Sequence, residues 1–162
     1  MESPSIYIPM DRRHALAHGR SLPERVQGTA LFADISGFTP LTEVLARELG
    51  PQRGSEEITR HLNQVYDAVI AEVHGHGGSV IGFSGDAITC WFDQDNGLRA
   101  TACGLAMQQA MASFANVRTP SGIAVPLVIK ASVTCGPARR FLVGDPEYSL
   151  VEALAGQTLD RL

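Results

Sequence analysis

Apolar residues early in the chain form first a continuous run and then a helical pattern. The run at residues 28–34 is largely apolar and predicts a buried strand. Thr39 and Pro40 follow it and indicate a helix start, because threonine caps helices and proline suits the first helical position. We expect this helix to end at Gly50, since a glycine commonly follows the last helical residue.

A second, longer helix is predicted from Ser55 to His74. Ser55 is a favourable N-cap, and the acidic residues at 56 and 57 suit the positive end of the helix dipole. Apolar residues then recur at intervals of three and four, which places them on one face. They are Ile58, Leu62, Val65, Val69, Ile70 and Val73.

The remaining pattern predicts hairpins on either side of one more helix. The expected elements are strands at 79–83 and 87–92, a helix at 98–114, a hairpin of strands 125–134 and 139–143 that turns at 135–137, and a strand at 148–155. Helices mixed with antiparallel hairpins indicate an α+β fold, not a doubly wound parallel sheet. Residues 1–27 are expected to form an N-terminal arm with a short helix at 12–18, ahead of one domain at 28–162.

Composition excludes several classes of function. The chain has 162 residues, of which 44% are hydrophobic, so it is long enough to bury the core of one domain. The net charge of -4 offers no basic face for nucleic acid. No uncharged apolar run approaches the roughly 20 residues of a membrane span, and the N-terminus lacks the apolar core of a secretory signal. We therefore expect a cytoplasmic protein with reduced cysteines and no membrane or nucleic-acid partner.

Two aspartates next to glycines are the strongest candidates for chemistry. Asp34 ends the first predicted strand and precedes Gly37, and Asp86 lies in the turn between two predicted strands. Two carboxylates from separate strands leave Mg²⁺ with open positions for substrate oxygens. Each aspartate also has a purely structural interpretation, because Asp and Gly are common in turns for conformational reasons. The expectation of a shared site rests on the pair.

The segments around these aspartates resemble the class III nucleotidyl cyclases. The first reads Phe-Ala-Asp-Ile-Ser-Gly-Phe-Thr at 32–39, and the second combines Gly-Gly at 77–78, Gly-Asp-Ala at 85–87 and Trp-Phe at 91–92. The resemblance covers residues from about 28 to 162 and is strongest to the first cyclase domain of soluble-adenylyl-cyclase-type tandem proteins. It implies a ferredoxin-like core, with a mixed or antiparallel sheet, helices packed on one face and a truncated C-terminal part.

The resemblance also implies roles for individual residues. Asp34 and Asp86 would bind two ions of Mg²⁺ or Mn²⁺, with the backbone carbonyl of Ile35 as a further metal ligand. The turn amides of Gly37, Phe38 and Thr39 match the stretch that binds the triphosphate. The implied reaction is attack of the ribose 3′-hydroxyl of ATP on the α-phosphate, which releases pyrophosphate.

Other positions depart from the family pattern. The family reads adenine with a lysine four residues before the second aspartate, and Gly82 stands there. The only lysine of the chain, Lys130, is too far along the sequence to replace it by position. The family's second base-reading residue and its ribose-orienting asparagine fall on Ala153 and Asp160. Its transition-state arginine falls at position 164, past the last residue.

The leading hypothesis is therefore half of an adenylate cyclase that converts ATP to 3′,5′-cyclic AMP. It is expected to need a second cyclase domain, downstream in the same polypeptide, for base recognition and transition-state residues. A homodimer of the fragment is expected to be unproductive, because both copies lack those residues. The alternative is a catalytically degenerate cyclase-homology domain that serves regulation or dimerisation. A diguanylate cyclase is disfavoured by the lack of its Gly-Gly-Asp/Glu-Glu-Phe turn.

Overall fold

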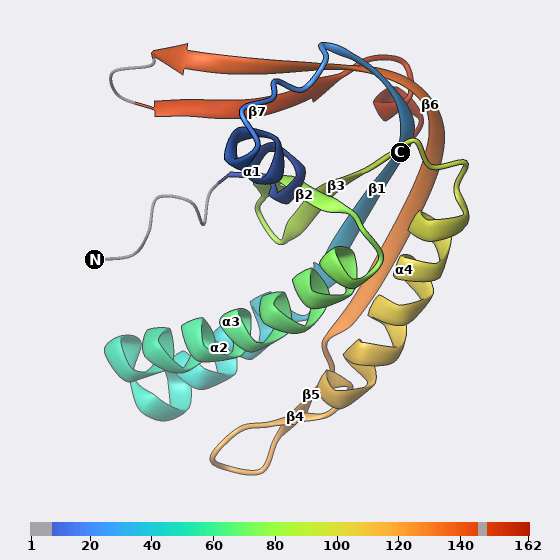
Figure 1. The fold of residues 1–162 in the computed structure, drawn as a ribbon. Helices are drawn as coiled ribbons and strands as arrows, with labels where there is room; N and C mark the ends of the chain where they lie inside the picture. The colour runs from blue at the N-terminus through green and yellow to red at the C-terminus, as the bar shows by residue number, and fades with distance from the viewer. Residues whose placement is uncertain (1–7, 146–148) are drawn as a thin grey trace.

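An antiparallel sheet of five strands, in the order β2-β3-β1-β6-β7, forms the centre of the structure (Figure 1). This computed structural model describes residues 8–145 and 149–162. The strands are β1 (Arg25–Ser36), β2 (Ser79–Ser84), β3 (Ala87–Asp93), β6 (Val128–Asp145) and β7 (Ser149–Ala155). The apolar sequence of β1 suits its central position, because most of its side chains are buried or half-buried on the two faces of the sheet.

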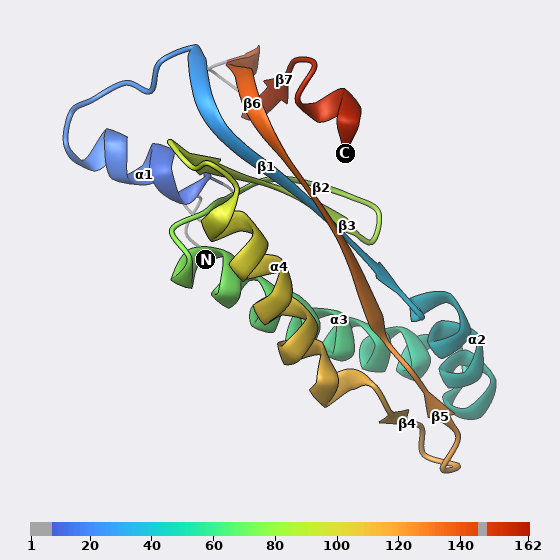
Figure 2. The same ribbon diagram turned by 90° about the vertical axis from the view of Figure 1, so that its right-hand side faces the viewer.

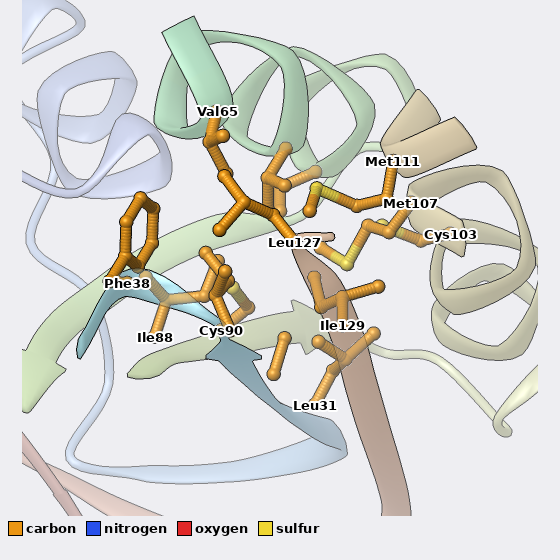
Figure 3. Packing of buried hydrophobic residues seen from close by; sticks show 14 of the residues in the cluster. Leu31, Phe38, Val65, Ile88, Cys90, Cys103, Met107, Met111, Leu127 and Ile129 are labelled. Atoms are coloured by element: carbon orange, nitrogen blue, oxygen red, sulfur yellow. The ribbon is translucent and has the colours of Figure 1, made fainter. Parts of the chain in front are cut away.

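Three helices cover one face of this sheet (Figure 2). They are α2 (Phe38–Leu49), α3 (Pro51–Gly75) and α4 (Leu98–Ala110). Their apolar faces meet the inward side chains of the strands, and Figure 3 shows Leu31, Val65 and Met107 converging from β1, α3 and α4. Gly104 of α4 faces the sheet, where a Cβ would meet that of Ala131 at 3.5 Å, an ordinary packing distance. The expected α+β architecture is confirmed.

Shorter elements complete the fold. They are α1 (Met10–Ala17), the 3₁₀ helices η2 (Met111–Phe114) and η3 (Leu159–Arg161), and the two-residue strands β4 (Val117–Arg118) and β5 (Ala124–Val125). The short helix expected at 12–18 is α1, which begins two residues earlier. No helix within the described residues is long and apolar enough to cross a membrane.

Helix starts were predicted less accurately than helix bodies. The long helix begins at Pro51 with Gly50 as its N-cap, so the predicted start at Ser55 is wrong and Ser55 lies inside α3. Proline at the first helical position explains the earlier start, because its missing N–H is not needed there. Thr39 is likewise not a cap, since α2 begins at Phe38 with Gly37 as its N-cap.

The hairpin predicted to turn at 135–137 is also wrong, because β6 runs unbroken from Val128 to Asp145. Its first part pairs with β1 and its last part with β7. Gly136 and Pro137 do not form a turn but contact Thr158, the N-cap residue of η3. The Thr158 hydroxyl donates to the Pro137 carbonyl at 2.6 Å, and a Cβ at Gly136 would lie 2.5 Å from that hydroxyl oxygen. Tyr148, predicted to begin β7, lies outside the described residues.

A buried ionic network attaches α1 to the C-terminal strands. Arg140 on β6 and Glu152 on β7 each have side chains only 1% exposed, and their Nε and Oε1 atoms are 2.6 Å apart. From α1, Asp11 pairs with Arg140 and Arg12 pairs with Glu152. The backbone N–H of Asp11 also donates to the Ser79 hydroxyl on β2 at 3.0 Å. Helix α1 therefore contacts both edge strands of the sheet, and β1 begins at Arg25, inside the predicted arm.

Candidate metal and triphosphate site

The strand register brings the two candidate aspartates together. Asp34 on β1 is paired with Ala87, the residue after Asp86. The N–H of Ile35 donates to the Asp86 carbonyl at 3.2 Å, which joins the β2–β3 turn to β1. The register therefore makes Asp34 a close backbone neighbour of the turn that carries Asp86. Asp34 lies within β1 and not after it, because the strand continues to Ser36.

Both carboxylates face away from the hydrophobic core. Asp34 alternates with the buried residues Ala33 and Ile35, so its side chain points to the opposite side of the sheet and is half-exposed. Asp86 is exposed at the turn. Within the described part of the chain, neither carboxylate accepts a hydrogen bond or joins an ion pair. Their oxygens are available to an external ligand.

Lys130 is a candidate residue that sequence reasoning dismissed. The register places it on β6 directly opposite Asp34, and it is exposed. Side chains of directly opposed residues lie on the same face of a sheet, so the ammonium group shares the face of the Asp34 carboxylate. Distance along the sequence concealed this, because 96 positions separate two residues that the sheet makes neighbours. Lys130 is the only lysine of the chain, which could have drawn attention to it. Its position beside Asp34 follows only from the register of β6 on β1.

The turn after β1 has a conformation that requires glycine. Gly37 has φ +112°, and a Cβ there would lie 2.3 Å from the Pro126 carbonyl oxygen. The close approach of residues 126–127 therefore fixes this turn in the absence of any ligand. Phe38 and Thr39 are the first residues of α2, where backbone N–H groups have no partner within the helix. Such a helix start suits an anion.

The donor atoms at this location fit a hard divalent cation. Two carboxylates and the Ile35 carbonyl would offer oxygen atoms, the ligand type that Mg²⁺ and Mn²⁺ prefer. No cluster of three or more His, Cys, Asp or Glu side chains placed to hold a metal occurs among the described residues. A cation held here would therefore keep coordination positions for water or substrate oxygens, as catalytic magnesium sites do.

Tyr66 on α3 lies beside the turn that carries Asp86. Its hydroxyl donates to the Gly85 carbonyl over 3.4 Å, and its ring meets that of Phe83 edge-on, with 5.5 Å between centroids. Burial raises the pKa of the Tyr66 hydroxyl, and the charges of Asp86 and Asp34 raise it further. The hydroxyl therefore remains protonated and able to donate at neutral pH. Sequence reasoning did not single out this tyrosine.

The positions that depart from the cyclase pattern lie in open surroundings. Gly82 lines a pocket of about 640 Å³ between α1, α3, β2 and β7, and a Cβ at Gly82 would meet no atom within 4 Å. Ala153 is half-buried on β7, the strand whose residues Val151 and Glu152 line the same pocket. Asp160 is exposed on η3.

Sequence comparison relates the chain to adenylate cyclases. No protein-family signature matches it. Human adenylate cyclase type 10 is 32% identical over 90 residues, which are 52% of this chain and 6% of that protein. The mouse protein of the same name is 35% identical over 78 residues, 45% of this chain and 5% of its own. Adenylate cyclase 1 of Rhizobium meliloti (strain 1021) is 28% identical over 104 residues, which are 61% of this chain and 14% of that protein. The aligned parts are thus small fractions of these relatives.

Solved structures give the same relationship. The adenylyl cyclase CyaB from P. aeruginosa has a TM-score of 0.69 and 25% identity, covering 85% of this chain and 69% of that one. The guanylyl cyclase Cya2 has a TM-score of 0.68 and 28% identity, covering 86% of this chain and 68% of that one. A bacterial light-regulated adenylyl cyclase shares the fold, with a TM-score of 0.76 and 19% identity over 96% of this chain and 45% of its own.

Proposed function

We propose that this chain, a homologue of the catalytic domains of class III nucleotidyl cyclases, is the metal- and triphosphate-binding half of an adenylate cyclase. The observation that supports this most is the pairing of β1 with β3, which brings Asp34 and Asp86 together with both carboxylates available. A structural role for these aspartates predicts hydrogen bonds to the carboxylates, and the described residues make none.

The residues of this half-site bind and orient the triphosphate. Asp34, Asp86 and the Ile35 carbonyl would hold two ions of Mg²⁺ or Mn²⁺, which neutralise charge on the reacting phosphates when bound. The N–H groups at the start of α2 bind phosphate oxygens. Lys130 adds a positive charge next to Asp34, on the face where the phosphates lie. In the proposed reaction the ribose 3′-hydroxyl loses its proton to solvent, its oxygen bonds to the α-phosphorus, and the bond from that phosphorus to the departing pyrophosphate breaks.

Base recognition has to come from another domain. Gly82 and Ala153 carry no polar side chain toward a base, and Asp160 replaces an amide with a negative charge. A complementary cyclase domain would supply lysine, a polar base reader, asparagine and arginine. The β6–β7 pair exposes apolar side chains on both of its faces, Val143 and Val151 on one and Leu142 and Leu150 on the other, each between 45% and 61% exposed, and such a partner could cover one of these faces. We propose ATP as the substrate because the curated relatives are adenylate cyclases.

The test is a cyclase assay on the chain alone and mixed with a class III cyclase domain that carries the missing base-reading residues. With ATP and Mn²⁺, we expect little or no cyclic AMP from the chain alone and clear production from the mixture. Asp34→Asn and Asp86→Asn should each abolish that production. Glu56→Gln, which removes an exposed carboxylate elsewhere on α3, should not.

Two results would overturn parts of this proposal. Robust turnover by the chain alone would show that base recognition does not need a partner. Full activity of the mixture with Asp34→Asn would remove the metal assignment. The lack of base-reading side chains at Gly82 and Ala153 also favours a second candidate, a degenerate cyclase-homology module that regulates or dimerises. That function predicts association with the partner domain but no dependence of activity on either aspartate.

A further inference from the structure

The turn that carries Asp86 is exposed on its outer side. Gly85 and Asp86 connect β2 and β3 in a two-residue turn, and the neighbouring Phe83 is 58% exposed. A carboxylate on an exposed turn loses conformational freedom when it binds a cation, and this loss weakens binding. A metal site gains affinity when its ligands are held in place beforehand by surrounding contacts. The contacts of this turn therefore bear directly on the proposed site.

Two elements hold the turn, one from each side. On the sheet side, the Ile35 N–H donates to the Asp86 carbonyl at 3.2 Å. On the helix side, the half-buried Tyr66 of α3 packs against the hydrophobic core and meets the Phe83 ring at an interplanar angle of 88°. Its hydroxyl reaches the Gly85 carbonyl at 3.4 Å, a long hydrogen bond, so the ring contact carries more of this attachment. Edge-to-face packing of this kind stabilises an aromatic pair beyond its buried area.

We propose that Tyr66 is a positioning residue, which holds the β2–β3 turn so that the Asp86 carboxylate meets the Asp34 carboxylate at one metal site. This inference rests on the proposed function, because it concerns the same cation. Tyr66 contributes no ligand: it contacts Phe83 and Gly85, on either side of Ser84, and acts through the backbone of the turn. Removal of the tyrosine should weaken metal binding even where the fold remains intact.

The experiment is a titration of the chain with Mn²⁺, with free Mn²⁺ followed by electron paramagnetic resonance. Tyr66→Phe removes the hydroxyl and keeps the ring, and should weaken Mn²⁺ binding by up to about fivefold, the effect of one modest hydrogen bond. Tyr66→Leu removes both contacts and should weaken it about tenfold or more. Asp86→Asn should abolish binding at the site.

The matched control is Leu62→Ala, one helical turn earlier on α3. Leu62 packs against the same hydrophobic core, so its truncation should lower stability without loosening the turn. Urea unfolding measures the stability of every variant, so that its loss of metal affinity can be compared with its loss of stability. If Leu62→Ala weakens Mn²⁺ binding as much as Tyr66→Leu at equal loss of stability, Tyr66 has only a structural role and the inference is wrong.

The outcomes separate this inference from the proposed function. Failure of the wild-type chain to bind Mn²⁺, or binding unchanged by Asp86→Asn, refutes the proposed metal site itself. Binding that Asp86→Asn abolishes but Tyr66→Leu leaves at wild-type affinity refutes only the role of Tyr66. Should Tyr66→Leu not fold, Phe83→Leu removes the same ring contact from the exposed side. It must then weaken Mn²⁺ binding more than Tyr66→Phe does, or the inference fails.

Discussion

Replacement of Arg140 by methionine should destabilise the protein severely. The Arg140 guanidinium is buried and pairs with Glu152 on β7 and with Asp11 on α1. Arg140→Met leaves the Glu152 carboxylate, which is 1% exposed, with Arg12 as its remaining partner. Removing one member of a buried ion pair costs about 3–5 kcal/mol, because the other charge stays buried without full compensation. That is a large fraction of the roughly 5–15 kcal/mol that holds a domain folded.

Trp91 gives a direct assay for this prediction. It is the only tryptophan, is 1% exposed and belongs to a small hydrophobic cluster that includes Ala138 of β6, so its fluorescence should report unfolding in urea. We expect Arg140→Met to lower the urea midpoint strongly. The double variant Arg140→Met/Glu152→Met should recover much of the loss, because a hydrophobic pair of similar volume can replace a buried ion pair. A loss below about 1 kcal/mol for Arg140→Met, the range of exposed ion pairs, would refute the reasoning.

The same network predicts a loss of stability in acid. Burial alone would raise the pKa of the Asp11 carboxyl, but the hydrogen bond and charge of Arg140 outweigh it and lower that pKa below its ordinary value of 3.8. A carboxyl with a lowered pKa in the folded state stabilises the fold above pH 3.8, and this stabilisation is lost as the pH falls through the folded-state value. Asp11→Asn should therefore lower the free energy of unfolding at pH 7 and make it less dependent on pH in the acid range.

Three further outcomes follow from single positions. Gly37→Ala should cost about 1–3 kcal/mol in urea unfolding, since the residue has φ +112° and its Cβ would lie 2.3 Å from a carbonyl oxygen. Asp95→Ala should cost about 0.5–2 kcal/mol, because its carboxylate accepts three N–H groups at the start of α4, and a melt equal to wild type would contradict this. Iodoacetamide at pH 8 should alkylate only Cys135 in the folded protein, because Cys90 and Cys103 are buried and burial raises the pKa of Cys103 to about 12. A second adduct in the intact mass would contradict this burial.

Local sequence patterns were sufficient to predict the bodies of the helices and to single out the two candidate aspartates. The 3.6-residue period of α3 is determined by contacts within one helix and the face it buries, so it can be read from a short window. Asp34 and Asp86 were identified in the same way, because each stands beside glycines at a strand end or turn. Glycine and proline were less reliable, since Gly136 and Pro137 resemble a turn but lie within β6.

Long-range pairings could not be predicted from such windows. Lys130 becomes a neighbour of Asp34 only through the register of β6 on β1, which depends on the whole sheet. Arg140 and Glu152 resemble ordinary surface charges on alternating strands until α1 covers them and supplies Asp11. Helix α1 therefore packs against the sheet, a contact that the weak periodicity of the N-terminal residues did not indicate.

Calorimetric titration of the chain with three triphosphates in the presence of Mn²⁺ tests the central claim most directly. The claim is that this chain holds the metal ions and the triphosphate and does not read the base. ATP, GTP and inorganic tripolyphosphate should then bind with affinities within about threefold of one another, and Asp34→Asn should abolish binding of all three. Binding of ATP about tenfold or more tighter than tripolyphosphate, or binding that survives Asp34→Asn, would contradict the account.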